Sequence, residues 1–233
     1  MERNSLLIIL NMKNILFIAI AIMMGMQFSA CEKEKTEGPN DLGGETNITL
    51  TEVGRESSVY ISIGTFNLPT GTMKVVSNND GVVTYNITLD LTGSPDSAII
   101  SALIPAEYKD AQGRINTDMK FKITSEGMQD YFTSDQPWTV AKYADGVGTQ
   151  YTIKTVNGDT LVRTITEKTG VDEWPLGFYL IKTSKVEQPL PASDEVATKI
   201  TYRVNHKFGL VYMQVDLKNG EVMKCDVVPW FLL

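Results

Sequence analysis

The chain is poor in the residues that bind metals and carry out nucleophilic catalysis. It has two cysteines and one histidine among 233 residues, which leaves too few soft ligands for a zinc or copper site. It also lacks a glycine-rich phosphate loop, a nucleophile elbow and an aspartate-rich calcium loop. We therefore expect no catalytic residue, no metal site and no cofactor, in a protein that is not an enzyme. The single histidine, His206, lies between Asn205 and Lys207, which is typical of a turn or a strand end.

Basic charge is also scarce. Lysine and arginine total 21 against 28 acidic residues, a net charge of -7. The first 30 residues contain Glu2, Arg3 and Lys13, a net charge of +1, so a chain without them would carry a charge near -8. An acidic surface argues against nucleic acid as a partner and against electrostatic binding to anionic lipid.

No hydrophobic run reaches the roughly 20 residues of a membrane-spanning helix. Residues 15–26 are free of charge, and Lys13 and Asn14 separate them from the apolar stretch 6–10. A positive end, a short apolar core and the small residues Ser29 and Ala30 are typical of a secretory signal peptide. We predict a signal peptide over residues 1–30, with Met12 as an alternative true start. A retained transmembrane helix is the other interpretation.

The end of this signal resembles the lipobox of bacterial lipoproteins of the Bacteroidetes type, in which a cysteine follows the cleavage point. Cys31 takes that position, and Phe28 stands where the family usually has leucine. The resemblance implies that Cys31 carries diglyceride and palmitate, and that the protein is anchored in the outer membrane, facing the periplasm or the cell surface. Two or three acyl chains hold a protein stably, since each buried methylene contributes about 0.8 kcal/mol. Cys225 would then have no disulfide partner, and we expect it as a small buried residue on a strand.

Composition divides the remainder into two parts. Residues 31–45 are rich in charge and glycine and have few apolar side chains, which predicts a lipidated flexible tether. Residues 46–233 are predicted to form a single β-rich domain.

The domain has the pattern of antiparallel strands joined by tight turns. Residues 72–76 and 82–89 flank the turn 78–81, and the same arrangement recurs around Asn157-Gly158 and Asn219-Gly220. Apolar and charged residues alternate over 118–123, as on a strand with one buried face. Residues 105–109 are the one short helical candidate. The fold class predicted is all-β and mainly antiparallel, as a single curved sheet or half-barrel, with a two-sheet β-sandwich as the alternative.

The second half of the chain also resembles a known type of domain. The motifs are Trp174-Pro175-Leu176-Gly177-Phe178 and Phe208-Gly209-Leu210-Val211, within residues 138–228. They are similar to periplasmic half-barrel domains of the lipoprotein-localisation-carrier type. The resemblance implies a curved antiparallel sheet wrapped around a hydrophobic cavity.

Several residues are candidates for binding or modification. Trp138, Trp174, Phe178 and Tyr179 could line an apolar pocket or a sugar-stacking surface, or could simply fill the core. Ser97 and Thr160 each follow an aspartate and precede an apolar residue, a pattern that resembles the O-glycosylation signal of exported Bacteroidetes proteins.

Three functions remain open. The first is an outer-membrane lipoprotein that binds an apolar or amphipathic small molecule in a half-barrel. The second is a structural, adhesive or glycan-capturing β-sandwich. The third is a carboxylate-dependent hydrolase, which would require two of Glu167, Asp172 and Glu173 to converge in a cleft.

Overall fold

The computed structural model describes residues 40–91, 108–133, 136–155, 158–194 and 196–229. The predicted signal peptide, Cys31, Ser97 and the start of the helical candidate lie outside these ranges. At the end of that candidate, Lys109 forms an isolated antiparallel bridge with Ile115, so this residue is extended. The described residues contain no helix that could span a membrane.

The described elements are one short 3₁₀ turn, η1, and fifteen strands. Their bounds are η1 Thr49–Thr51, β1 Glu56–Ile63, β2 Phe66–Asn67, β3 Gly71–Asn79, β4 Val82–Leu89, β5 Ile115–Ile123, β6 Gly127–Asp130, β7 Trp138–Lys142, β8 Gln150–Lys154, β9 Thr160–Lys168, β10 Trp174–Leu176, β11 Tyr179–Ile181, β12 Ser184–Pro189, β13 Ala197–Asn205, β14 Gly209–Leu217 and β15 Val222–Pro229.

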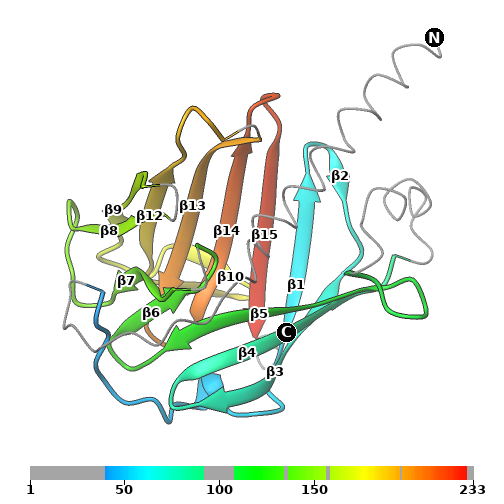
Figure 1. Ribbon diagram of the computed structural model, residues 1–233. Coiled ribbons are helices and arrows are strands. Elements are labelled where there is room, and N and C mark those ends of the chain that lie inside the picture. Colours follow the sequence, from blue (N-terminus) through cyan, green and yellow to red (C-terminus); the bar gives the residue numbers. More distant parts are fainter. Residues whose placement is uncertain (1–39, 92–107, 134–135, 156–157, 195, 230–233) are drawn as a thin grey trace.

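One sheet contains all the strands except β10 and β11. Its order is β7-β6-β5-β4-β3-β1-β15-β14-β13-β12-β9-β8, with β2 paired to β1, and every pairing is antiparallel. The first and last strands meet at its centre, where Val59 pairs with Val227. In Figure 1, β13, β14, β15 and β1 form an upright wall and β3 to β5 cross in front of it. The predicted all-β, curved single sheet is therefore confirmed, and the two-sheet sandwich does not form.

Alternating burial explains why the long strands form. Along β4, Val83, Tyr85, Ile87 and Leu89 are buried, while the residues between them are partly exposed. The predicted turn joins β3 and β4 through Asp80 and Gly81, whose φ angles of 50° and 80° match the type I′ turn favoured by hairpins. The pattern of period two thus places one face of each strand on the inside of the curl.

The two ends of the sheet, β7 and β8, are brought together by side chains. The Lys142 backbone N–H donates to the Tyr151 hydroxyl at 3.0 Å. Nearby, the guanidinium of Arg163 on β9 donates to the Trp138 carbonyl of β7 at 3.1 Å and to the Asp130 carboxylate of β6 at 2.7 Å. The sheet is consequently nearly closed, like a barrel.

The Arg163–Asp130 pair is completely enclosed, with side-chain exposures of 1% and 0%. Arg163 also donates to Gln188 at 3.0 Å and to the Tyr202 hydroxyl at 3.1 Å, and it stacks 3.7 Å from the centre of the Trp138 ring. Burial raises the pKa of Asp130, and the charge and hydrogen bond of Arg163 act in the opposite direction. This buried cluster ties β6 and β7 to β9, β12 and β13.

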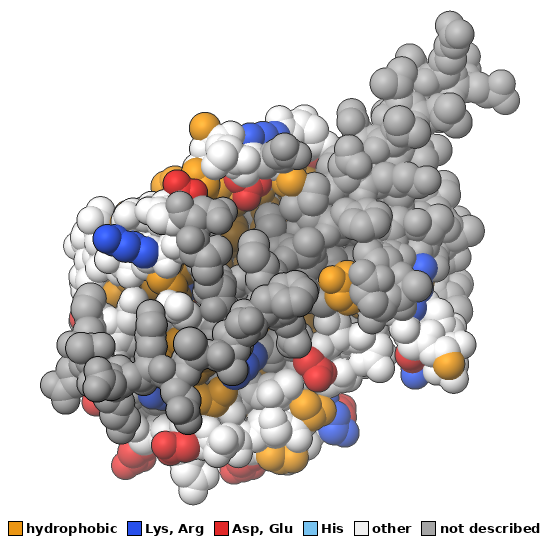
Figure 2. Space-filling model, in the orientation of Figure 1, with side chains coloured by type: hydrophobic (Ala, Val, Ile, Leu, Met, Phe, Trp, Pro, Cys, Tyr) orange, Lys and Arg blue, Asp and Glu red, His pale blue; other side chains and the backbone are white. Residues whose placement is uncertain are grey.

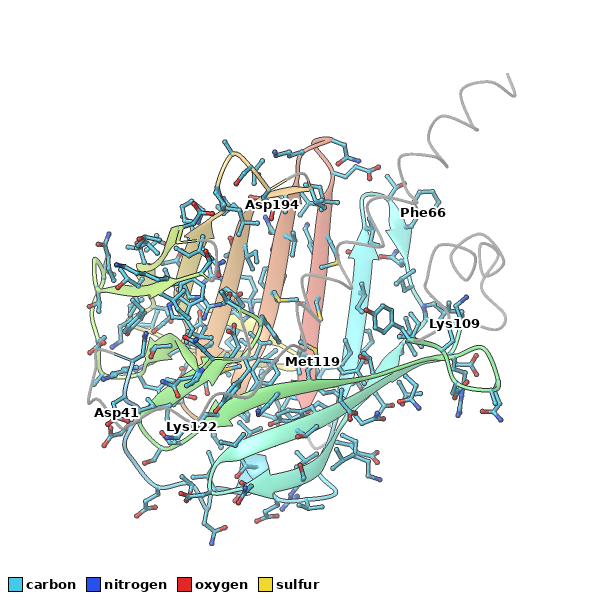
Figure 3. The ribbon with its side chains drawn as sticks, in the orientation of Figure 1. Asp41, Phe66, Lys109, Met119, Lys122 and Asp194 are labelled. Atoms are coloured by element: carbon cyan, nitrogen blue, oxygen red, sulfur yellow. The ribbon has the colours of Figure 1, made fainter. Side chains whose placement is uncertain are left out.

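Residues 40–45, assigned from the sequence to the flexible tether, contact the domain. Leu42 is 3% exposed, and its carbonyl accepts a hydrogen bond from Lys122 Nζ at 3.1 Å. The Glu45 backbone N–H donates to the Ser125 hydroxyl at 2.9 Å. The packed part of the chain therefore begins before residue 46. Figure 3 shows Asp41 and Lys122 at the same end of the molecule.

Candidate ligand-binding cavity

The inside of the curled sheet contains an apolar cavity of about 60 Å³. Its walls come from β1, β3, β4, β5, β14 and β15 and from the chain that follows β2. The lining residues are Val59, Ile61, Ile63, Leu68, Met73, Ile87, Leu89, Ile115, Thr117, Met119, Phe121, Leu210, Met213, Met223, Cys225 and Val227. A water molecule needs about 10–15 Å³ measured this way, together with polar partners. The cavity has the space, but Thr117 supplies its only hydroxyl.

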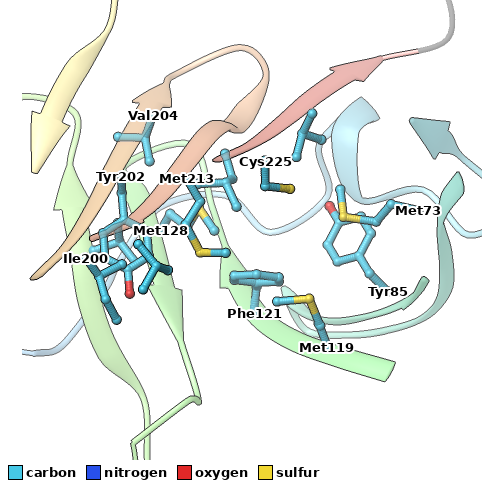
Figure 4. Close-up of a cluster of buried hydrophobic side chains, with 14 of the residues drawn as sticks. Met73, Tyr85, Met119, Phe121, Met128, Ile200, Tyr202, Val204, Met213 and Cys225 are labelled. Atoms are coloured by element: carbon cyan, nitrogen blue, oxygen red, sulfur yellow. The ribbon is translucent and has the colours of Figure 1, made fainter. Parts of the chain in front are cut away.

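The cavity arises because two walls of the same sheet face each other across the curl. In Figure 4, Met119 and Phe121 on β5 face Met213 on β14 and Cys225 on β15. All four side chains are buried. Alternate residues of each strand point inward, so a series of apolar positions, interrupted only by Thr117, lines the space along the strands.

Methionine makes up an unusual share of this wall. Five of the ten methionines fall within residues 1–30. Of the five others, Met73, Met119, Met213 and Met223 line the cavity, and Met128 is buried outside it. Methionine is unbranched, polarizable and able to change rotamer at low cost, so it suits surfaces that adapt to a variable apolar guest. The cavity wall can therefore reshape more easily than a wall of valine and isoleucine.

Cys225 contributes a thiol to this wall. Its burial raises the pKa of the Cys225 thiol to about 12, so the nucleophilic thiolate is nearly absent at neutral pH. The prediction of a small buried side chain on a strand is confirmed, because Cys225 lies buried and free of any disulfide on β15.

The four aromatic residues singled out in the sequence occupy different environments. Trp138 is fully buried beneath Arg163, so it belongs to the core and not to a surface. Trp174 is half-buried, 4.0 Å from the Arg203 guanidinium. Phe178 and Tyr179, where β10 turns into β11, are 87% and 56% exposed. None of the four lines the cavity, so the structure does not bring them together as one site.

The carboxylates considered for hydrolysis do not line the cavity either. Glu167 accepts two hydrogen bonds from Arg203, at 2.9 and 3.2 Å, and the hydrogen bond from Arg203 lowers the pKa of Glu167. Asp172 and Glu173 are exposed just before β10. The structure thus gives Glu167 a structural partner and leaves the other two carboxylates in solvent.

The remaining candidates lie at turns and strand ends. His206 is exposed in the turn between β13 and β14, with its ring centre 6.5 Å from that of Tyr143. Thr160 is exposed at the start of β9. Within the described ranges, no three His, Cys, Asp or Glu side chains gather closely enough to hold a metal ion.

The sequence interpretation missed the cavity residues. A signal was present, because four of the five methionines outside the first 30 residues fall at inward positions of predicted strands, namely Met73, Met119, Met213 and Met223. What the sequence does not show is which inward positions face a filled interior and which face a hollow one.

Comparisons with known proteins give structural similarity at low sequence identity. No family model and no curated protein matches the chain. Among solved structures, a Bacteroides fragilis protein described as exported with a YmcC-like fold has a TM-score of 0.43 and 7% identity, covering 76% of this chain and 95% of its own. A protein described as a lipoprotein of Parabacteroides distasonis has a TM-score of 0.43 and 9% identity, covering 80% and 98%. Likenesses at this level do not assign the chain to a family.

Proposed function

We propose that this protein is an exported lipoprotein, anchored to the outer membrane through Cys31, that binds the hydrocarbon part of an apolar or amphipathic molecule inside its curled sheet. The observation that supports this most is the apolar, methionine-lined cavity. An acyl chain entering it would leave water, a gain of about 0.8 kcal/mol per methylene. The methionine side chains of the wall can change rotamer at low cost, which favours adjustment of the cavity to its guest.

A pair of size-increasing variants tests the cavity. Ile87 lines it and is 8% exposed, whereas Ile153 is 7% exposed on β8 and does not line it. Ile87→Phe should fill the space and weaken binding of a fluorescent fatty acid at least tenfold with little loss of stability. Ile153→Phe should overpack a filled region, costing about 1–3 kcal/mol, and should leave affinity unchanged. Equal affinities of the two variants for the fluorescent fatty acid, or no binding by the wild type, would contradict the proposal.

The anchor needs its own test, because Cys31 lies outside the described residues. Cells expressing the wild type and Cys31→Ala would be labelled with palmitate. Label should enter only the wild type, and the variant should leave the membrane fraction. Equal labelling of the wild type and the variant would contradict lipidation at Cys31.

The exposed turn between β10 and β11 supports a second candidate, capture of a glycan or partner surface. Phe178, Tyr179 and Leu180 are 87%, 56% and 58% exposed, and aromatic faces of this kind are typical of binding surfaces. Phe178→Ser with Tyr179→Ser should abolish retention on a glycan array without changing fatty-acid binding. Unchanged retention by the double variant would exclude this role.

A further inference from the structure

A second cavity, of about 600 Å³, adjoins the first along the strands. On β1, β3, β4 and β15 its lining residues are Glu56, Ser57, Val75, Tyr85 and Pro229. Glu56 is exposed, and the other four are buried. The lining residues of the first cavity on the same four strands include Val59, Met73, Ile87 and Val227, each two positions from one of the four buried residues. Residues two apart share a face of a strand, so the two cavities are consecutive sections of the same concave face.

The boundary between the cavities is an aromatic pair. Tyr85 lines the second cavity and Phe121 the first, and their ring centres are 5.8 Å apart in an edge-to-face contact. Figure 4 shows Tyr85 beside Met73, with Phe121 further along the interior. An extended molecule passing this pair would contact both cavities.

The chemistry changes at this boundary from apolar to mixed. Beside Ile48, Leu50 and Val75, the second cavity is lined by the hydroxyl-bearing Ser57 and Tyr85. It therefore combines a hydrocarbon wall with groups able to donate hydrogen bonds.

Some of the charged side chains at the second cavity are paired, and one part of its rim carries a positive charge that is unpaired among the described residues. Arg55 is paired with Glu52 at 2.6 Å, and Glu56 with Lys74 at 2.9 Å. His206 and Lys207 also line the cavity, and the described residues supply neither with an ion-pair partner. An anion placed here would meet an uncompensated lysine and an imidazole at its rim. Figure 2 shows lysine, arginine and acidic side chains interspersed on the visible face.

We propose that the second cavity binds the anionic head, a carboxylate or phosphate, of an amphiphile whose hydrocarbon tail occupies the first cavity. This inference rests on the proposed function and narrows its ligand to a molecule with one anionic end. Tyr85 and Phe121 flank the junction between head and tail. Lys207 provides the charge that distinguishes an acid from a neutral lipid, and the His206 imidazole lies beside it at the rim.

The test compares probes of equal chain length. Wild-type protein should bind palmitate at least tenfold more tightly than hexadecanol, a difference of about 1.4 kcal/mol. The double variant His206→Gln with Lys207→Gln should lose this preference and keep its affinity for hexadecanol. The matched control Lys154→Gln removes an exposed charge on β8 and should behave as wild type. Inorganic phosphate without a tail should bind at least a hundredfold more weakly than palmitate.

The outcomes separate the two proposals. If hexadecanol binds and palmitate has no advantage, or if the double variant weakens both equally, the head site is refuted and the tail cavity stands. If neither probe binds, the proposed function itself fails. Tight binding of phosphate alone would show a free-anion site.

A second readout locates the head directly. His206 is the only histidine in the chain, so the Hε1 proton of its imidazole gives a single unambiguous signal. Palmitate should shift that signal and hexadecanol should not. A signal unmoved by saturating palmitate would place the head elsewhere.

Discussion

The replacement of Arg163 by methionine should be among the most destabilising single changes in the described core. The variant removes a guanidinium that is 1% exposed and leaves the Asp130 carboxylate enclosed at 0% exposure. It also removes hydrogen bonds to Gln188, to the Tyr202 hydroxyl and to the Trp138 carbonyl. Methionine approximates the length of the arginine stem, so the loss is mainly electrostatic.

The expected cost is about 3–5 kcal/mol, the range for breaking one side of a buried ion pair. Burial raises the pKa of Asp130, and Arg163 is the main group that opposes this rise. Without Arg163, the folded-state pKa of Asp130 therefore rises further above the unfolded value of about 3.9. The folded variant then binds a proton more tightly than the unfolded chain does. Its deficit relative to wild type should therefore shrink as the pH falls through that raised pKa.

The assay is urea unfolding followed by tryptophan fluorescence, to which buried Trp138 contributes, at pH 7 and at pH 5. The double variant Arg163→Met with Asp130→Leu removes both charges and should recover most of the loss, because apolar replacement of a buried pair is often neutral or stabilising. A single variant that costs less than about 1 kcal/mol, or a double variant no better than the single, would refute this account of the sheet closure.

Three further predictions concern other parts of the fold. Gly127→Ala should destabilise the protein by more than about 2 kcal/mol in thermal unfolding, because the new Cβ would lie 2.5 Å from the Ala141 carbonyl oxygen. The control Gly146→Ala, whose new Cβ would have no atom within 4 Å, should leave stability unchanged. Equal effects of the two variants would contradict the predicted clash. Cys225, whose thiol pKa is raised to about 12, should react with a thiol reagent at pH 8 only as fast as the protein unfolds; rapid labelling of native protein would show the cavity to be open. The pKa of Glu167 is lowered by Arg203, so the pairing stabilises the fold above the unfolded pKa of about 4.3, and this stabilisation is lost as the pH falls through the folded pKa. The difference in unfolding free energy between wild type and Arg203→Gln should therefore narrow below pH 4. A difference that stays constant with pH would exclude this linkage.

The sequence contained most of the information for the strands and their turns. Alternation over 118–123 and the turn at Asp80-Gly81 correctly located β5 and the β3–β4 hairpin. These features are local, because side-chain period and turn conformation are set by neighbouring residues. The curvature of the sheet is consistent with this alternation and these turns, but local sequence patterns do not specify how far the sheet closes.

The buried cluster around Arg163 and the cavity could not be predicted from local sequence patterns. Arg163 and Asp130 lie 33 residues apart, and each would be read as a surface charge on a strand. Their pairing depends on β6 meeting β9 across the closed end of the sheet. The sequence left Trp138 open between a pocket or surface residue and a core residue, and its complete burial beneath Arg163 places it in the core. The environment of each of these residues depends on contacts between strands far apart in the sequence, which form when the sheet closes.

The methionine methyl groups provide the most direct test of the hollow interior. A protein labelled with ¹³C-methyl methionine and lacking residues 1–30 has five such groups, four of them in the cavity wall and one, Met128, buried outside it. On titration with palmitate, the signals of Met73, Met119, Met213 and Met223 should shift together and saturate, while Met128 stays in place. Five unmoved signals, or a shift of Met128 equal to the others, would contradict binding inside the sheet.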